Sequence, residues 1–464
     1  MSWLPFAHAL VARQDLPVPA WLFAWGASIV LIVSFLALAA AWRKPRFEQQ
    51  RWRPFGAGWA RALVSLPVQA VCGAIGVFLL GVAIYAGLRG TEAPDRNFAL
   101  TFLFVTCWLG FPFFSAILGD VFRPFNPWRA VGRLAGAGFG AVAGQRPAHI
   151  AYPEAIGRWP AAIGLIAVVW LEVVYGASGG VAVGLSPHAA GVAASVYTVY
   201  TLAMMALFGV EKWCERGEVF SVYFGMFSQL GCFGVENGRL GRRRPLATAT
   251  RWASLPGSAA VVIASIATTS FDGAQEGAFK SAIEWLFDRL ADTGMDLTTA
   301  LRLTDTIFMA ACFAGVGLVY LLGVRGMRTV ARAPSFAQLR AGFAHTLIPI
   351  ALAYLVAHYF SLFVFQEQAQ FTYLLSDPLG TATTDLFGTA SGSVDYTIIS
   401  ATAVWYVQVG ALVVGHVLGL TLAHDRALVY WPDYRDASRS QYWMLAVMVA
   451  FTCFGLYLLS AGNG

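Results

Sequence analysis

Three ionisable side chains inside long apolar segments are the residues of this sequence best suited to chemistry. Glu172 lies in IAVVWLEVVYG, Asp272 ends ASIATTSFDG, and His358 lies in AHTLIPIALAYLVAHYF. A charged side chain is costly inside a membrane, so such residues usually bind, relay protons or react. Two carboxylates and an imidazole suit general acid–base catalysis and metal binding. Glu172, Asp272 and His358 are therefore the candidate catalytic residues.

Two further histidines are candidate ligands. His345 and His358 share one apolar segment, but on one helix their spacing gives about 220° of rotation and about 19 Å of rise. A kink at Pro349 would not close that distance, so the two rings cannot bind one ion. We expect His345 to lie near the inner membrane face at the same depth as His416. His345 and His416 are thus the candidate cofactor pair for a divalent metal, a haem or copper, and His358 is the third candidate metal ligand. The alternative is that each histidine is a hydrogen-bonded packing residue.

The segments that carry these residues predict an integral membrane protein. Of the 464 residues 58% are hydrophobic and only 12% are charged, where soluble domains carry about 25%. A membrane-spanning helix needs about 20 apolar residues. The sequence predicts an all-α bundle in one membrane domain, 1–464, with about ten spans: 20–42, 64–88, 97–119, 159–177, 189–210, 254–272, 304–324, 341–365, 397–422 and 441–462.

The distribution of Lys and Arg predicts the orientation of these spans. With the N-terminus outside, 25 of the 31 basic residues fall in inner segments and 6 in outer ones, as the positive-inside rule requires. Both termini are then outside, and the long outer loops are 273–303 and 366–396. The net charge of +6 has this topological explanation and does not indicate nucleic-acid binding. Arginine-rich, lysine-poor usage suggests a bacterial gene, so we expect a multi-pass protein of the bacterial plasma (inner) membrane.

Three shorter features lead to structural expectations. The apolar segment 219–234 is too short to span and should be interfacial or re-entrant. The inner loop with Asp120 and RPFNPWR (123–129) should be anchored at the interface, because Trp and Arg suit that environment. EGAFKSAIEWLFDRLADTG in the loop 273–303 has the spacing of an amphipathic surface helix. Small residues recur every four positions at Ala411, Gly415, Gly419 and Ala423, which predicts close packing against another helix, most simply 341–365.

The sequence also resembles a family of bacterial multi-pass membrane proteins known as fenitrothion hydrolases. The resemblance spans nearly the whole chain and rests on Ala7-His8 with RQDLPVPAWLFAWG (13–26), FNPWRA, WLEVVY (170–175), GEVFSVYFGMF (217–227), TTSFDG (268–273), AHTLIPIALAYLVAHYFS (344–361) and VQVGALVVGHVLGLTLAHDRAL (407–428). It implies hydrolysis of an apolar aryl phosphorothioate triester, and it assigns no catalytic residue.

Three functions remain open at this stage. A metal-dependent hydrolase of organophosphorus triesters would use a bound metal to activate water and polarise the ester. A proton- or metal-coupled transporter of a small molecule would use the same intramembrane Glu, Asp and His as a relay. A haem- or copper-binding protein would use His345 and His416 as axial ligands.

Overall fold

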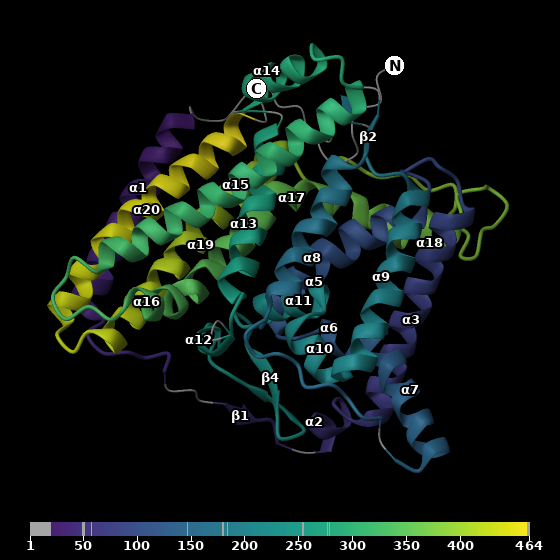
Figure 1. Cartoon of the computed structure of the whole chain (residues 1–464), viewed down its shortest axis with the longest axis horizontal. Coiled ribbons are helices and arrows are strands. Elements are labelled where there is room, and N and C mark those ends of the chain that lie inside the picture. The colour runs from purple at the N-terminus through teal and green to yellow at the C-terminus, as the bar shows by residue number, and fades with distance from the viewer. Residues whose placement is uncertain are drawn as a thin grey trace.

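The computed structural model describes residues 20–461, apart from 49–51, 57, 146, 179–180, 183, 253–254, 276 and 278. Ala7-His8 and the first part of the motif 13–26 lie outside these residues. The described chain is an all-α bundle with a few very short strands, as predicted (Figure 1).

The helices follow the apolar segments of the sequence closely. In chain order they are α1 (Ala20–Ala41), α2 (Gly58–Ala62), α3 (Leu66–Arg89), α4 (Phe98–Leu100), the π-helix η1 (Thr101–Gly110), α5 (Phe111–Leu118), α6 (Phe122–Phe125), α7 (Pro127–Ala143), α8 (Trp159–Val169), the π-helix η2 (Trp170–Val174), α9 (Pro187–Phe208), α10 (Val210–Arg216), α11 (Val219–Ser228), α12 (Ala249–Trp252), α13 (Ser258–Gln275), α14 (Lys280–Ala291), α15 (Leu297–Met327), α16 (Phe336–Phe343), the 3₁₀-helix η3 (Ala344–Leu347), α17 (Ile348–Phe371), α18 (Tyr373–Ser376), α19 (Ala401–Tyr430) and α20 (Tyr434–Ala461).

Eight helical segments of the described chain are long and apolar enough to cross a bilayer, so the protein is an integral membrane protein. They coincide with eight of the ten predicted spans. The other two predicted spans are also helical: α8 and η2 together cover 159–174, and α13 covers most of 254–272. The first of these is short for a span, and α13 carries Ser, Thr and Asp side chains that are buried by neighbouring helices.

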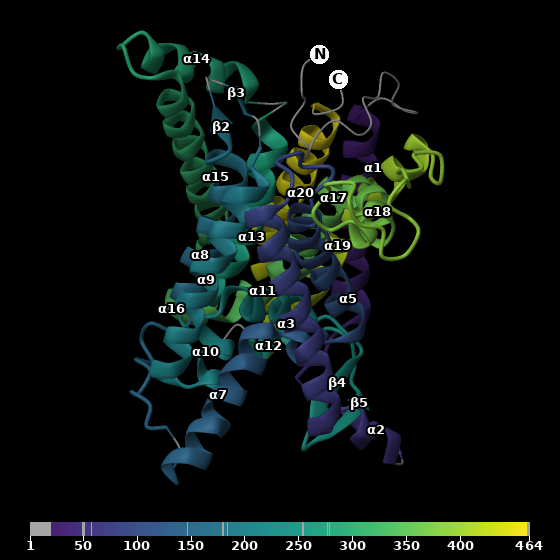
Figure 2. The same cartoon turned by 90° about the vertical axis from the view of Figure 1, so that its right-hand side faces the viewer.

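The predicted outer and inner segments lie at opposite ends of the bundle. Helix α14 and the region around α18 lie at one end, where α1 begins and α20 finishes (Figures 1 and 2). Helices α2, α7 and α10 lie at the other end. We name these the outer end and the inner end. Helix α14 is mostly exposed, as the amphipathic pattern predicts.

Short antiparallel strands lie at both ends of the bundle. At the inner end β1 (Arg53–Pro54), β5 (Arg239–Arg242) and β4 (Phe233–Glu236) pair in that order, with Arg53 opposite Arg242 and Val235 opposite Leu240. At the outer end β2 (Ala177–Ser178) pairs with β3 (Val181–Ala182).

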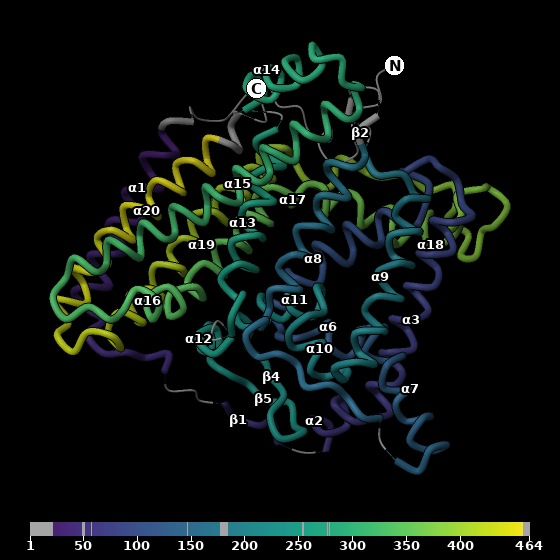
Figure 3. Tube along the Cα trace, viewed as in Figure 1, coloured from purple at the N-terminus to yellow at the C-terminus, as the bar shows by residue number. Residues whose placement is uncertain are grey.

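Two groups of helices meet in the middle of the molecule. Helices α1, α15, α19 and α20 pack with one another on one side, so the first and last helices of the chain are neighbours (Figure 3). Helices α3, α8 and α9 lie on the other side, and α13 and α17 stand between the two groups.

Helices α17 and α19 pack backbone to backbone, which confirms the small-residue prediction at two glycines. A Cβ placed on Gly415 would lie 2.3 Å from the Cβ of Ala353 and 2.7 Å from the carbonyl oxygen of Pro349. A Cβ on Gly419 would lie 2.8 Å from the carbonyl oxygen of Thr346. Only glycine allows the backbones to approach this closely.

The short apolar segment 219–234 forms α11, which is buried inside the bundle. Its side chains pack on α5, α8 and α17, and Phe224 and Phe227 are completely buried. The chain enters α11 from α10 and leaves it through β4, both at the inner end. This burial favours the re-entrant interpretation over the interfacial one.

Candidate functional site

The structure brings Asp272 and His358 into direct contact. Asp272 lies near the outer end of α13, and its Oδ2 is 2.9 Å from Nε2 of His358 on α17. The hydroxyl of Tyr359 donates to the same Oδ2 at 2.5 Å. Two helices that are far apart in the sequence are therefore joined by one carboxylate. We name Asp272, His358 and Tyr359 the Asp–His–Tyr cluster.

Burial differs sharply between the members of this cluster. The Asp272 side chain is 3% exposed, whereas the His358 side chain is 21% exposed. A buried carboxylate is tolerated only when donors satisfy it, and here an imidazole and a phenol do so. Gly273 lets the ring approach, since a Cβ there would lie 3.3 Å from Nδ1 of His358. The imidazole is thus the more accessible member of the pair.

Glu172, the third predicted catalytic residue, lies near this cluster. It is half-buried on η2, and its carboxylate is within electrostatic range of the hydroxyls of Tyr359 and Tyr223. The short π-helix η2, which carries Glu172, continues directly from the end of α8. Such π-helical segments are rare and occur often at functional sites. Glu172, Asp272 and His358 therefore belong to one neighbourhood, and the role predicted for them stays a prediction.

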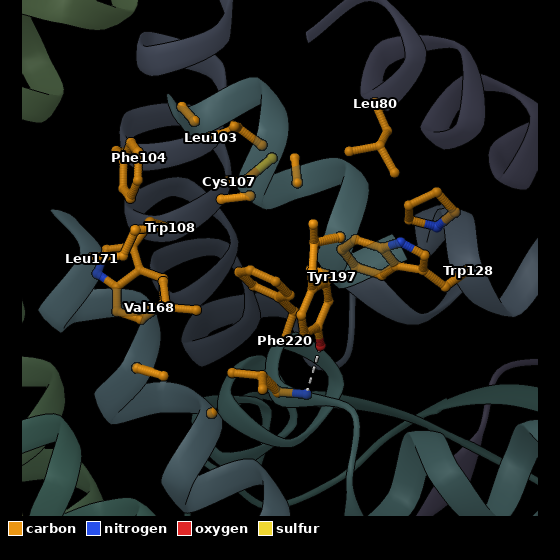
Figure 4. A pocket seen from close by; sticks show the side chains of 18 of the residues that line it. Leu80, Leu103, Phe104, Cys107, Trp108, Trp128, Val168, Leu171, Tyr197 and Phe220 are labelled. Atoms are coloured by element: carbon orange, nitrogen blue, oxygen red, sulfur yellow. Dashed lines mark hydrogen bonds between the residues drawn. The ribbon is translucent and has the colours of Figure 1, made fainter. Parts of the chain in front are cut away.

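Two aromatic rings separate this neighbourhood from a large cavity. Tyr223 of α11 stacks on Trp108 of η1 with ring centroids 4.8 Å apart. Trp108 in turn lines a cavity of about 1170 Å³ between α3, η1, α8, α9 and α11. Figure 4 shows Trp108, Leu171 and Val168 on one side of this cavity, and Trp128 and Tyr197 on another.

The cavity wall is almost entirely apolar. Its lining includes Leu80, Leu103, Phe104, Val168, Leu171 and Phe220, with only a few polar groups such as Thr106 and Cys107. The volume exceeds the 300–1,000 Å³ typical of small-molecule pockets. An apolar or amphipathic molecule is the kind of ligand such a wall accepts.

A buried carboxylate at the inner side of this cavity has a structural role. Glu218 is completely buried and accepts hydrogen bonds from the Tyr197 hydroxyl at 2.6 Å and from Asn126 Nδ2 at 3.1 Å. It also caps α11 by accepting from the backbone N–H groups of Phe220 and Ser221. The segments FNPWRA (125–130) and GEVFSVYFGMF (217–227) meet at this contact. Trp128 of FNPWRA is buried and stacks on Phe220, so the predicted interfacial anchor is wrong.

The candidate cofactor histidines are completely buried. His416 is within 2.7 Å of the Leu412 carbonyl through Nδ1, which leaves its Nε2 buried without a hydrogen-bonding partner. His345 contacts the backbone of Gly342, and its Nε2 is likewise buried without a partner. This is the orientation that ligating histidines adopt.

The helix register does not place the two rings opposite each other. Gly415, next to His416, faces Pro349, and Gly419 faces Thr346, next to His345. His416 therefore lies closer to Pro349 in depth than to His345. Within the described residues no three His, Cys, Asp or Glu side chains lie close enough to hold a metal ion. The shared metal or haem site stays a prediction.

Glu367 is a buried carboxylate that the sequence did not single out. Both of its carboxylate oxygens are buried and lack a hydrogen-bonding partner. The hydroxyl of neighbouring Thr106 is also buried without a partner, because it does not reach hydrogen-bonding geometry with Glu367. Nine residues separate Glu367 from His358, so the two side chains project from opposite faces of α17. Its position late in a long apolar helix was the available signal.

A partly buried charge cluster joins α6 and α7 to α10 at the inner end. Glu211 contacts Arg133 at 2.7 Å, Arg129 at 3.0 Å and Arg123 at 3.2 Å. Partial burial alone would raise the pKa of Glu211, but the three arginines outweigh it and lower the pKa below its usual 4.5. The cluster fixes the inner ends of these helices.

Comparison with known proteins identifies no similar protein. The chain matches no protein-family model, no curated protein and no solved structure.

Proposed function

We propose that the protein is a proton-coupled transporter of the bacterial plasma membrane. The observation that carries this proposal is the Asp–His–Tyr cluster within the bundle, where Asp272 accepts from both His358 and Tyr359. Ionisable residues at such positions commonly form proton relays in membrane transporters.

The cluster has the properties that proton exchange needs. Protonation of His358 next to ionised Asp272 forms an ion pair, and loss of that proton leaves one net negative charge. In a low-dielectric interior this change of charge alters the stability of the local arrangement strongly. His358 is the more exposed member, so it is the group through which a proton would enter or leave. Glu172 would modulate the charge of the cluster from η2.

Proton flux into vesicles tests this proposal. The protein is reconstituted in phosphatidylethanolamine and phosphatidylglycerol vesicles that enclose a pH-sensitive dye, and a pH gradient is imposed. We expect flux above that of empty vesicles, and we expect Asp272→Asn to abolish the excess. Glu367→Gln is the matched control, because it alters another buried carboxylate on the far face of α17. Wild-type flux equal to that of empty vesicles, or full flux in Asp272→Asn, would refute the proposal.

A second candidate function is hydrolysis of an apolar phosphorothioate triester, which the family resemblance implies. Two observations support it. An imidazole held by a carboxylate is the arrangement of a general base, and the apolar cavity suits such a substrate. Activity would then depend on His358 and Asp272, and release of the phenol by purified protein measures it. Retention of full turnover in His358→Ala would remove this site.

The haem or copper function remains the third candidate. The partnerless Nε2 atoms of His345 and His416 favour it. Protein produced with haem and copper available would show an absorption band that is lost in His416→Ala. A colourless, metal-free protein that is folded would count against this function.

A further inference from the structure

We propose that the cavity between α8 and α9 binds an acyl chain of a membrane phospholipid, which enters sideways from the bilayer. This inference names a substrate class for the proposed transport function. Only the statement that the bound lipid is the transported molecule rests on that function. The binding itself requires only the cavity.

The cavity opens towards the surrounding bilayer. Helix α8 packs on α11 and α13, whereas α9 packs on α3 and α7, and the cavity lies between α8 and α9. Two residues that line the cavity remain largely exposed: Ile163 on α8 is 63% exposed, and Val196 on α9 is 64% exposed. Both project from helices that run through the apolar part of the bundle. The opening therefore faces lipid hydrocarbon.

The shape of the cavity fits a chain better than a compact solute. Lining residues from the start of α8 to the residue after η2 run from Trp159 to Tyr175, which is about 24 Å at 1.5 Å per residue. On α9 they run from His188 to Tyr200, about 18 Å by the same rise. One leaflet contributes about 15 Å to the hydrocarbon core, so the cavity is longer than one leaflet is deep.

Amphipathic rings lie at both ends of the cavity. Trp159 and Tyr200 line its inner part, and Tyr175 and His188 line its outer part. Such rings favour the boundary between hydrocarbon and headgroups. A lipid with its chain in the apolar middle would have its ester and headgroup region near one of these pairs.

The wall between the cavity and the Asp–His–Tyr cluster is thin. Trp108 lines the cavity, Tyr223 stacks on Trp108, and Glu172 is within electrostatic range of Tyr223. Tyr223 is also within electrostatic range of Tyr359, so these two rings connect the cavity to the cluster. This contact provides a route by which lipid binding and proton binding influence each other.

Retention of phospholipid by purified protein tests this inference. The protein is extracted from membranes, washed extensively in detergent, and analysed by phosphate content and native mass spectrometry. We expect the wild-type chain to retain phospholipid. Val196→Trp fills the opening and should reduce retention about tenfold, equivalent to about 1.4 kcal/mol. The matched control is Val199→Trp, on the same helix, where Val199 is 70% exposed but does not line the cavity.

A second variant guards against an effect of one substitution on folding. Ile163→Trp fills the opening from α8 and should act like Val196→Trp, while all three variants elute as monodisperse protein. Equal phospholipid retention in Val196→Trp and wild type, or none in folded wild type, would overturn the inference. Retention of free fatty acid in place of phospholipid would overturn the choice of ligand.

The proton-coupled function is tested separately by the same measurement. Asp272→Asn leaves the cavity intact and should retain phospholipid as the wild type does. If Asp272→Asn loses proton flux but retains phospholipid, both proposals are supported. If the wild type retains phospholipid but shows no proton flux, only the transport function is refuted.

Discussion

The hydroxyl of Tyr359 should stabilise the fold almost entirely through the ionised carboxylate of Asp272. Tyr359→Phe removes the donor of the 2.5 Å hydrogen bond, and Asp272→Asn replaces the charged acceptor by a neutral amide. The two single variants and the double variant form a thermodynamic cycle. The cycle measures the coupling between the two side chains directly.

The size of the coupling follows from the kinds of hydrogen bond involved. A hydrogen bond to a charged group contributes about 1.5–3 kcal/mol, whereas neutral side-chain bonds in membrane proteins average about 0.6 kcal/mol. Tyr359→Phe should therefore cost about 1–2 kcal/mol more in the wild-type background than in the Asp272→Asn background. A difference of this size changes the folded-to-unfolded ratio roughly 5- to 30-fold.

Unfolding free energies of the four proteins in mixed detergent micelles provide the assay. Tyr354→Phe is the control, because Tyr354 lies on the same helix and donates to the neutral carbonyl of Phe451 at 2.9 Å. Its cost should add to that of Asp272→Asn without coupling. If the effects of Tyr359→Phe and Asp272→Asn are simply additive, the carboxylate does not act as a charged acceptor and the account of the cluster is wrong.

Four further variants test other parts of the structure. Gly415→Ala should lower the unfolding free energy by about 1–3 kcal/mol through overpacking. The control is Gly410→Ala, where a new Cβ meets no atom within 4 Å; this change should raise the unfolding free energy by up to about 1 kcal/mol through helix propensity. Equal effects of the two substitutions would contradict the close contact of α17 with α19. Glu367→Gln should leave the stability unchanged or raise it at pH 8, because it removes a buried charge without a partner; a loss above about 1 kcal/mol would mean that a bound cation or other donor satisfies Glu367. The pKa of Glu211 is lowered in the folded state, so its contribution to stability is present above pH 4.5 and is lost as the pH falls through the lower folded pKa. Thermal melting from pH 6 to pH 3 should therefore show an acid loss in wild type that Glu211→Gln lacks.

The positions of the helices could be predicted from the sequence because apolar length alone determines them. Every predicted span coincides with a helix, and the glycine spacing on α19 identified its partner α17. The ends were less accurate, since polar residues extend α19 to Tyr430 and begin α20 at Tyr434. In these stretches the helix continues past the apolar segment, and hydropathy does not predict the position of such helix ends.

The candidate site could be predicted in part. Their positions in apolar segments singled out Asp272 and His358, and the structure joins them. The sequence did not single out Tyr359, although it is the next residue along α17, because an aromatic residue in an apolar helix is usually a packing residue. Trp128 was assigned to the interface from its type, but it packs inside on Phe220. Sequence gives depth along a helix, and it does not give the direction in which a side chain faces.

The glycine contacts of α19 have a consequence for how the molecule would change shape. Helices α17 and α19 touch backbone to backbone at Gly415 and Gly419, so neither can rotate against the other without collision. They should move as one rigid body that carries His358 and Tyr359. In the proposed transporter, alternation of access would then come from helices outside this pair, such as α8 with η2, sliding or tilting past it, as in a shear motion. Glu172 would travel with the mobile partner, and its separation from Asp272 would report which way the molecule faces.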